Sequence, residues 1–183
     1  MNPAVVFHSS ALIVALVAAT MDARTGRIPN ALTIPAALVA VLMHVPMGVA
    51  GIGLSVAGCT LAALLPWSMH RVTRGAAIGG GDVKLFAALG ALCGPAMGLE
   101  IELSAFVLVA VFAMVRLAFV GRLLRMLGNV ACLVVNPFLP AKYRRPMDAE
   151  AFTAMRMGPA IFVGLACVLV RNGVLGWVPW LAR

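Results

Sequence analysis

The stretch AVVFHSSALIVALVAATM, residues 4–21, contains no Asp, Glu, Lys or Arg. A helix that crosses a membrane needs about 20 mostly apolar residues, so we expect this stretch to be a transmembrane helix. No Lys or Arg precedes it, and further apolar stretches follow it. These two features favour a retained first helix over a cleaved signal peptide.

The same composition continues along the chain. Of its 183 residues 63% are hydrophobic and 11% are charged, whereas a water-soluble domain carries about 25% charged residues. A backbone in lipid must satisfy its own hydrogen bonds, which leaves helices or closed barrels, and the long Ala, Leu and Val runs do not alternate as barrel strands do. We predict an all-α membrane protein, a bundle of about six transmembrane helices near residues 4–21, 31–48, 52–69, 83–98, 101–120 and 158–180.

The basic residues indicate how the bundle is oriented. The net charge is +8, but the Lys and Arg residues are scattered, which argues against binding to nucleic acid. They gather in three predicted loops, and the other two loops have none. The positive-inside rule therefore predicts an extracytoplasmic N-terminus and three cytoplasmic loops, at 22–30, 70–82 and 121–157.

The remaining loops, 44–52 and 94–101, are then extracytoplasmic, and we interpret Glu100 and Glu102 as interface residues on that side. In the long loop 121–157, apolar and basic side chains occupy opposite faces of a helical pattern, which predicts a helix lying in the cytoplasmic membrane interface. No repeat or linker divides the chain, so residues 1–183 are expected to form one domain.

Two of the six carboxylates, Asp22 and Asp82, lie at predicted helix ends on the same cytoplasmic side. An ionisable group close to lipid is energetically costly and is a candidate functional residue. Asp82 follows the glycines at 79–81, which permit positive φ values and close approach of another segment. Two neighbouring carboxyl groups share a proton, so one can activate water while the other polarises a carbonyl.

The two aspartates could instead have a purely structural role, in which they pair with Arg24 and Lys84 or simply cap helix ends. A serine nucleophile is disfavoured because the serines lack a GxSxG context. A metal site is disfavoured because the three histidines lie on separate segments and the four cysteines form no CxxC pair. We therefore expect no metal and no cofactor.

DARTGRIPN, residues 22–30, followed by GGGDVKL, residues 79–85, resembles the paired signature of the type IV prepilin peptidases, whose second motif is the GxGD element of intramembrane aspartic proteases. The resemblance implies that Asp22 and Asp82 are the catalytic pair. It assigns Gly79, Gly81 and Lys84 to the second motif. MRMGPAIFVG, residues 155–164, is similar to the segment that opens the family's last helix.

The resemblance also implies an activity. It is that of an aspartic endopeptidase that cleaves the leader of type IV or Flp prepilins, or of pseudopilins, after a glycine at the cytoplasmic face of the bacterial inner membrane. The partners would be this substrate and the lipid bilayer. The larger family members carry a region with CxxC motifs and methylate the product, and this chain lacks that region. We expect the short, peptidase-only form without a methyltransferase domain.

Four further positions are open to two interpretations each. Asn30 could bind the substrate backbone or be the N-cap of the second helix. Lys84 could stabilise charge near the pair or extend to lipid headgroups. Gly158 and Pro159 could shape the cleft, although both residue types are common in membrane helices.

Two functions remain as alternatives to the peptidase. One is a small membrane transporter, or a membrane component that binds protons or a cation through the aspartates. The second is a catalytically silent partner in pilus assembly. Helix centres that are almost bare of polar groups argue against a proton path, and the retained aspartates argue against a silent role.

Overall fold

A computed structural model describes residues 3–75, 77–119 and 156–173, and within these ranges the chain is helical without any strand. The helices are α1 (Pro3–Thr25), α2 (Asn30–His44), the 3-10 helix η1 (Val45–Met47), α3 (Gly48–Val72), α4 (Gly80–Cys93), α5 (Pro95–Phe119) and α7 (Gly158–Arg171). The prediction of an all-helical membrane protein is therefore supported at this level.

Each predicted span overlaps one of these helices. Three stretches are long and apolar enough to cross a membrane: Pro3–Thr25, Asn30–Val72, which contains α2, η1 and α3, and Pro95–Arg116. A bundle with six crossings stays a prediction. The predicted interfacial helix lies within 121–157, of which all but the last two residues are outside the described ranges.

The predicted loop at 94–101 is wrong. Only Gly94 separates α4 from α5, with a φ of 81°, a backbone conformation that glycine adopts without steric cost. One glycine thus reverses the chain where we expected a loop of several residues. As a result Glu100 and Glu102 lie within α5, and the Glu102 side chain is buried. The position of the two glutamates at the membrane interface stays a prediction.

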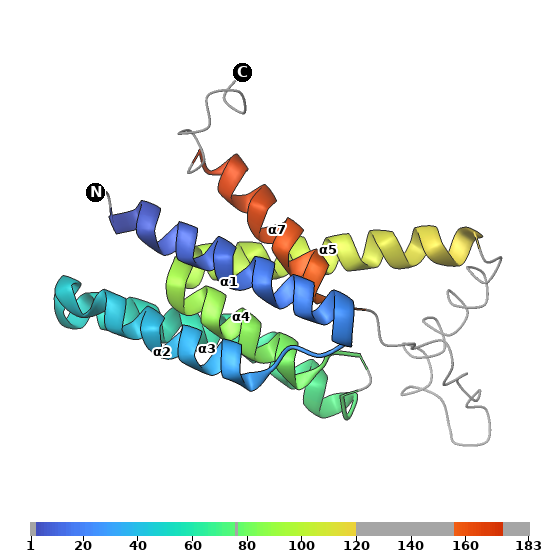
Figure 1. Cartoon of the computed structure of the whole chain (residues 1–183), viewed down its shortest axis with the longest axis horizontal. Coiled ribbons are helices and arrows are strands. Elements are labelled where there is room, and N and C mark those ends of the chain that lie inside the picture. The colour runs from blue at the N-terminus through green and yellow to red at the C-terminus, as the bar shows by residue number, and fades with distance from the viewer. Residues whose placement is uncertain (1–2, 76, 120–155, 174–183) are drawn as a thin grey trace, which may run out of the picture.

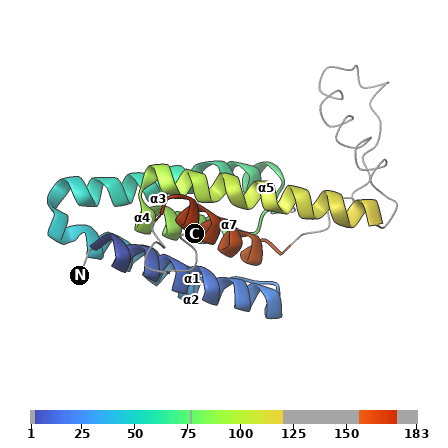
Figure 2. The same ribbon diagram turned by 90° about the horizontal axis from the view of Figure 1, so that it is seen from above.

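The helices form three layers (Figure 2). α1 and α2 make one outer layer, α3 and α5 make the other, and α4 and α7 lie between them. α4 packs against α1, α2, α3 and α5, and most of its side chains are buried. The outer helices expose many large apolar side chains, as expected of a surface that faces lipid.

Two glycines allow α3 and α4 to come into backbone contact. A Cβ atom on Gly58 would lie 2.1 Å from the carbonyl oxygen of Gly90, and one on Gly90 would lie 2.2 Å from that of Gly58. Ser55 strengthens the crossing because its hydroxyl donates to the carbonyl of Ala91 at 2.9 Å. Small residues and interhelical hydrogen bonds of this kind drive helix association in membranes, where the hydrophobic effect gives little help.

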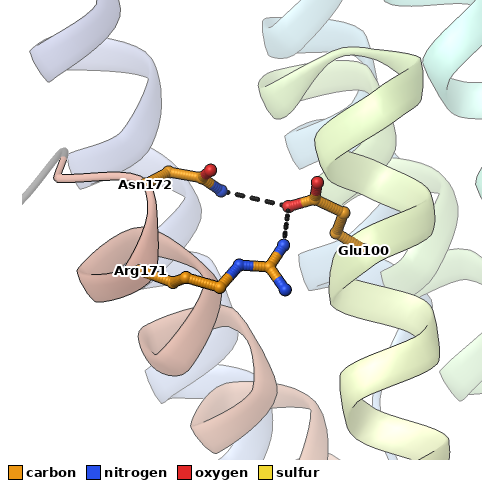
Figure 3. A network of polar contacts seen from close by, with 3 residues as sticks. All are labelled: Glu100, Arg171 and Asn172. Carbon is orange, nitrogen blue, oxygen red and sulfur yellow. Dashed lines mark hydrogen bonds and ion pairs between the residues drawn. The ribbon is translucent and has the colours of Figure 1, made fainter.

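α7 is held at both ends. At its C-terminal end, Arg171 forms an ion pair of 2.7 Å with Glu100 of α5, and Asn172 donates to the same carboxylate oxygen at 3.0 Å (Figure 3). At its N-terminal end it meets the last turn of α1, and the starts of α4 and α7 lie at the same end of the bundle as the end of α1 (Figure 1). This end is where the candidate site forms.

We expect Gly58→Ala to destabilise the protein by about 1–3 kcal/mol, because the added methyl group overpacks the crossing with α4. Gly53→Ala is the matched control in the same helix, since a Cβ there meets nothing within 4 Å and alanine favours helix. Thermal unfolding of the detergent-solubilised variants checks this. Equal melting temperatures would show that the crossing is not tight.

Candidate active site

Asp22 lies in the last turn of α1 and is 5% exposed. Its Oδ2 accepts a hydrogen bond of 2.9 Å from the backbone N–H of Gly158, the first residue of α7. The partial positive charge of a helix N-terminus stabilises a carboxylate at this place. The Arg156 guanidinium also donates to the carbonyl oxygen of Ala23. The start of α7 is therefore fastened to α1 directly at Asp22.

Gly158 makes this contact possible. A Cβ atom there would lie 2.7 Å from the Cβ of Asp22 and 3.0 Å from its Oδ2, which is closer than real side chains come. Of the two residues that we expected to shape the cleft, Gly158 thus touches an aspartate directly. Pro159, the next residue, is exposed.

Asp82 lies in the first turn of α4 and is 9% exposed. Its Oδ2 accepts a hydrogen bond of 3.1 Å from the backbone N–H of Gly79, and its own N–H donates to the Gly79 carbonyl oxygen at 3.1 Å. Asp82 therefore closes the start of its own helix. Both aspartates are buried, and each binds one backbone N–H at the start of a helix.

Contacts between the two motifs bring the aspartates into each other's electric field. A Cβ on Gly81 would lie 2.8 Å from the carbonyl oxygen of Ile28, so the start of α4 packs on the segment that follows α1. Asp82 is outside the three candidate membrane spans. Burial and then the charge of Asp22 raise the pKa of Asp82 to about 6, above its ordinary 3.8, and the Gly79 hydrogen bond opposes this rise. Asp82 therefore takes up a proton at a higher pH than an isolated aspartate does.

The glycine run provides close contacts and no left-handed backbone. None of Gly79, Gly80 and Gly81 has a positive φ, because these residues already adopt the conformations of a helix start. The absence of side chains here allows close contacts. Gly81 lies against Ile28, and a Cβ on Gly79 would lie 3.0 Å from Oδ2 of Asp82. The close approach of another segment is observed, whereas the positive φ values that glycine permits are not used here.

Asn30 and Lys84 bind each other. The Lys84 Nζ donates to Oδ1 of Asn30 at 2.6 Å, joining the start of α4 to the start of α2. Pro29 occupies the N-cap position of α2, without a side-chain capping bond, so the interpretation of Asn30 as the N-cap is wrong. Both side chains are exposed beside the motifs that hold the aspartates.

Of the two structural roles predicted for the aspartates, helix capping is observed among the described residues and ion pairing is not. Within the described ranges the ion pair found is that of Arg171 with Glu100, so pairing with Arg24 or Lys84 is not what holds the aspartates. Capping is real, because both carboxylates accept helix-start N–H groups. Capping leaves one oxygen of each carboxyl group free of these bonds, so the same residues remain able to react.

One residue near the site, His70, was not predicted from the sequence. Its Nδ1 lies 2.7 Å from the carbonyl oxygen of Ile78, in the loop that leads to Asp82. The two quoted Asp motifs do not contain this histidine, and no local pattern between positions 70 and 78 signals the contact.

Comparison with known proteins adds a family. The type IV leader peptidase family model matches residues 9–114, a range that includes Asp22 and Asp82. Comparisons with the curated proteins and with the solved structures gave no match. Among the described residues, no three His, Cys, Asp or Glu side chains gather so that they could hold a metal ion.

We expect Asp82→Asn to stabilise the protein in a pH-dependent way. Because the pKa of Asp82 is raised in the folded chain to about 6, the folded site favours the protonated form. In the wild type, protonated Asp82 therefore adds its full contribution to the free energy of unfolding below about pH 4. Up to about 3 kcal/mol of that free energy is lost as the pH rises through 6. Asn stays neutral and keeps an acceptor for Gly79. Melting temperatures at about pH 4.5 and 8, on either side of this pKa, should show a larger gain for the variant at the higher pH; an equal difference at both contradicts the raised pKa.

Proposed function

The chain belongs to the type IV leader peptidase family, and from this premise we propose that it is an aspartic endopeptidase whose catalytic pair is Asp22 and Asp82. Membership in the family implies a peptidase that acts on prepilin-type substrates. The aspartic mechanism and the residues that perform it are the proposal.

One observation carries this proposal. Two buried carboxyl groups, from motifs that are far apart in sequence, lie at one end of the bundle, and the charge of one raises the pKa of the other. Burying a carboxylate beside a like charge is costly, and a purely structural cap does not require it. Perturbed, paired carboxyl groups are typical of acid–base catalysis.

The hydrogen bonds suggest how the two roles divide. Asp22 faces the N-terminus of α7 and receives the Gly158 N–H on Oδ2, which favours a negative charge there. We assign Asp22 as the general base, with its Oδ1 free to bind the attacking water. Asp82, with its raised pKa, is assigned as the carboxylic acid that donates a hydrogen bond to the scissile carbonyl.

The reaction then needs no covalent intermediate. Water attacks the carbonyl carbon and gives one proton to Asp22, while the carbonyl oxygen takes the proton of Asp82. The tetrahedral intermediate collapses when the leaving nitrogen takes the proton from Asp22 and the C–N bond breaks. Asp82 regains its proton from the intermediate, so the shared proton of the pair is restored.

The substrate that we propose is a type IV or Flp prepilin, or a pseudopilin, in the lipid bilayer of the bacterial inner membrane. By the positive-inside rule, the basic loops favour a cytoplasmic position for the end of the bundle with the aspartates and an extracytoplasmic N-terminus. Cleavage would occur where the basic leader meets the apolar helix of the substrate.

Asn30 and Lys84 are proposed to contact this substrate. Their hydrogen bond of 2.6 Å is exposed, and it links the starts of α2 and α4 next to Asp82. A substrate backbone could exchange hydrogen bonds with the amide of Asn30, and Lys84 would then be released to interact with the pair or the peptide.

The alternative, a proton- or cation-binding membrane component, has one observation in its favour. Glu102 of α5 is 2% exposed, and neither of its carboxylate oxygens has a hydrogen-bond partner in the structure. Intramembrane carboxyl groups of this kind often relay protons. In this alternative Glu102 would act together with the aspartates, and no peptide bond would be cleaved.

Asp22→Asn and Asp82→Asn should each lower cleavage by about 100-fold to 10,000-fold, because each removes an acid–base group. Co-expression with a candidate prepilin, followed by gel shift and N-terminal sequencing of the product, measures this. Glu102→Gln is the matched control: it neutralises a buried carboxyl group outside the site and should leave cleavage unchanged. Processing by both Asn variants would refute the aspartic mechanism, and absence of cleavage by the wild type as well would favour the alternative.

Gly158→Ala should lower kcat by about 100-fold, because its methyl group would lie 2.7 Å from the Asp22 Cβ and a displacement near 1 Å has an effect of this size. Gly53→Ala is the control for a tolerated glycine change. Initial rates with purified protein in detergent check the effect. Normal kcat in Gly158→Ala would mean that Asp22 is not held by the start of α7 during the reaction.

A further inference from the structure

A single peptide group connects His70 with Asp82. The carbonyl oxygen of Ile78 lies 2.7 Å from Nδ1 of His70, and the N–H of the same peptide group, which belongs to Gly79, donates to Oδ2 of Asp82 at 3.1 Å. A carbonyl oxygen can only accept, so His70 Nδ1 carries the hydrogen. Because a peptide group is planar and rigid, fixing its oxygen also fixes the direction of its N–H.

The turn after α3 is built around the imidazole ring. The N–H of Gly75 donates to the His70 carbonyl oxygen at 2.9 Å. Gly75 has a φ of 82°, and a Cβ on it would lie 3.2 Å from Cε1 of the ring, while a Cβ on Gly80 would lie 3.8 Å from the same atom. The ring therefore lies between the turn and the first residue of α4.

Among the described residues of the loop, 73–75 and 77–79, the other hydrogen bonds do not reach this peptide group. Thr73 accepts the Ala77 N–H at 3.3 Å and donates to the Met69 carbonyl at 2.7 Å, but these bonds end before Ile78. The Ile78 side chain is buried, at 2% exposure, which anchors the residue but does not set the direction of its carbonyl group. The glycines that follow impose few backbone restrictions.

We propose that His70 is a positioning residue for catalysis, which holds the peptide group of Ile78 and Gly79 so that its N–H points at the carboxyl group of Asp82. This role rests on the proposed function, since it takes Asp82 as the catalytic acid. His70 touches neither reacting carboxyl group in this arrangement and acts through one backbone unit.

The hydrogen bond to Ile78 does more than orient. A donor on a peptide oxygen polarises the peptide group and strengthens its N–H as a donor, by about 10–30%. A stronger bond from Gly79 favours the ionised form of Asp82, because hydrogen bonds to a carboxylate lower its pKa. The charged group that acts on Asp82 is Asp22 of α1, and Lys84 of α4 is bound to Asn30. Removing the His70 donor should therefore raise the pKa of Asp82 further.

Three substitutions at position 70 distinguish the effect of the hydrogen-bond donor from the effect of side-chain volume. His70→Ala removes the donor. His70→Asn keeps one, because the Asn amide nitrogen occupies nearly the place of Nδ1. His70→Gln keeps an amide but extends it by one bond, past the Ile78 oxygen. His44→Ala is the control for loss of a structural histidine, since the Nδ1 of His44 also bonds a backbone carbonyl, that of Ala40 at 2.8 Å, away from the site.

The measurement is the pH profile of kcat, with KM, for prepilin cleavage by purified protein. We expect His70→Ala to lower kcat by about 10-fold with KM within about 2-fold, and to move the high-pH limb, where Asp82 loses its proton, to higher pH. His70→Asn should restore both, His70→Gln should not, and His44→Ala should leave the limb in place. If His70→Ala does not fold, the comparison of Asn with Gln carries the test.

An unchanged limb in His70→Ala, or an Asn variant no better than the Gln variant, overturns the inference. Asp82→Asn in the same assay separates this from failure of the proposed function: if that variant cleaves normally, Asp82 is not catalytic and the function itself fails. Hydrogen exchange of the peptide spanning residues 77–82 adds a readout independent of activity. Exchange at the Gly79 amide should be faster in His70→Ala than in His70→Asn.

Discussion

Two carboxyl groups buried together repel each other, and the structure around them compensates for that repulsion. Asp22 and Asp82 each receive one backbone N–H, from Gly158 and from Gly79. These donors belong to the starts of two helices, where N–H groups have no partner within the helix. The positions of α4 and α7 are therefore tied to the pair, and the rest of the bundle has to bring three helix ends to one place.

Glycine makes that convergence possible. At Gly158 and Gly81 the chain touches Asp22 and Ile28 at distances that exclude any side chain, and at Gly58 it touches the backbone of α4. Each contact brings two segments closer than larger residues would allow. In lipid, where apolar side chains gain little by association, such contacts together with interhelical hydrogen bonds hold a bundle. Tight packing and the geometry of the site thus have the same origin.

The parts of the fold that depend on composition could be predicted from the sequence, and those that depend on geometry could not. Apolar runs predicted the helices, and the two Asp motifs predicted which carboxyl groups come together at one end. The prediction failed at Gly94, where one residue replaces the expected loop. The burial of Glu102 and the contact of His70 with Ile78 could not be predicted from nearby residues. Both depend on how the helices and the loop pack in three dimensions.

The length of α4 has a further consequence for the surroundings of the site. Its 14 residues cover about 21 Å, whereas the hydrocarbon core of a bilayer is about 30 Å thick. Because α4 is enclosed by α1, α2, α3 and α5, its length leaves the first turn, with Asp82, within the thickness of a bilayer that the longer outer helices would set. Hydrolysis consumes a water molecule, so a peptidase with its site at this depth needs a route for water through the bundle.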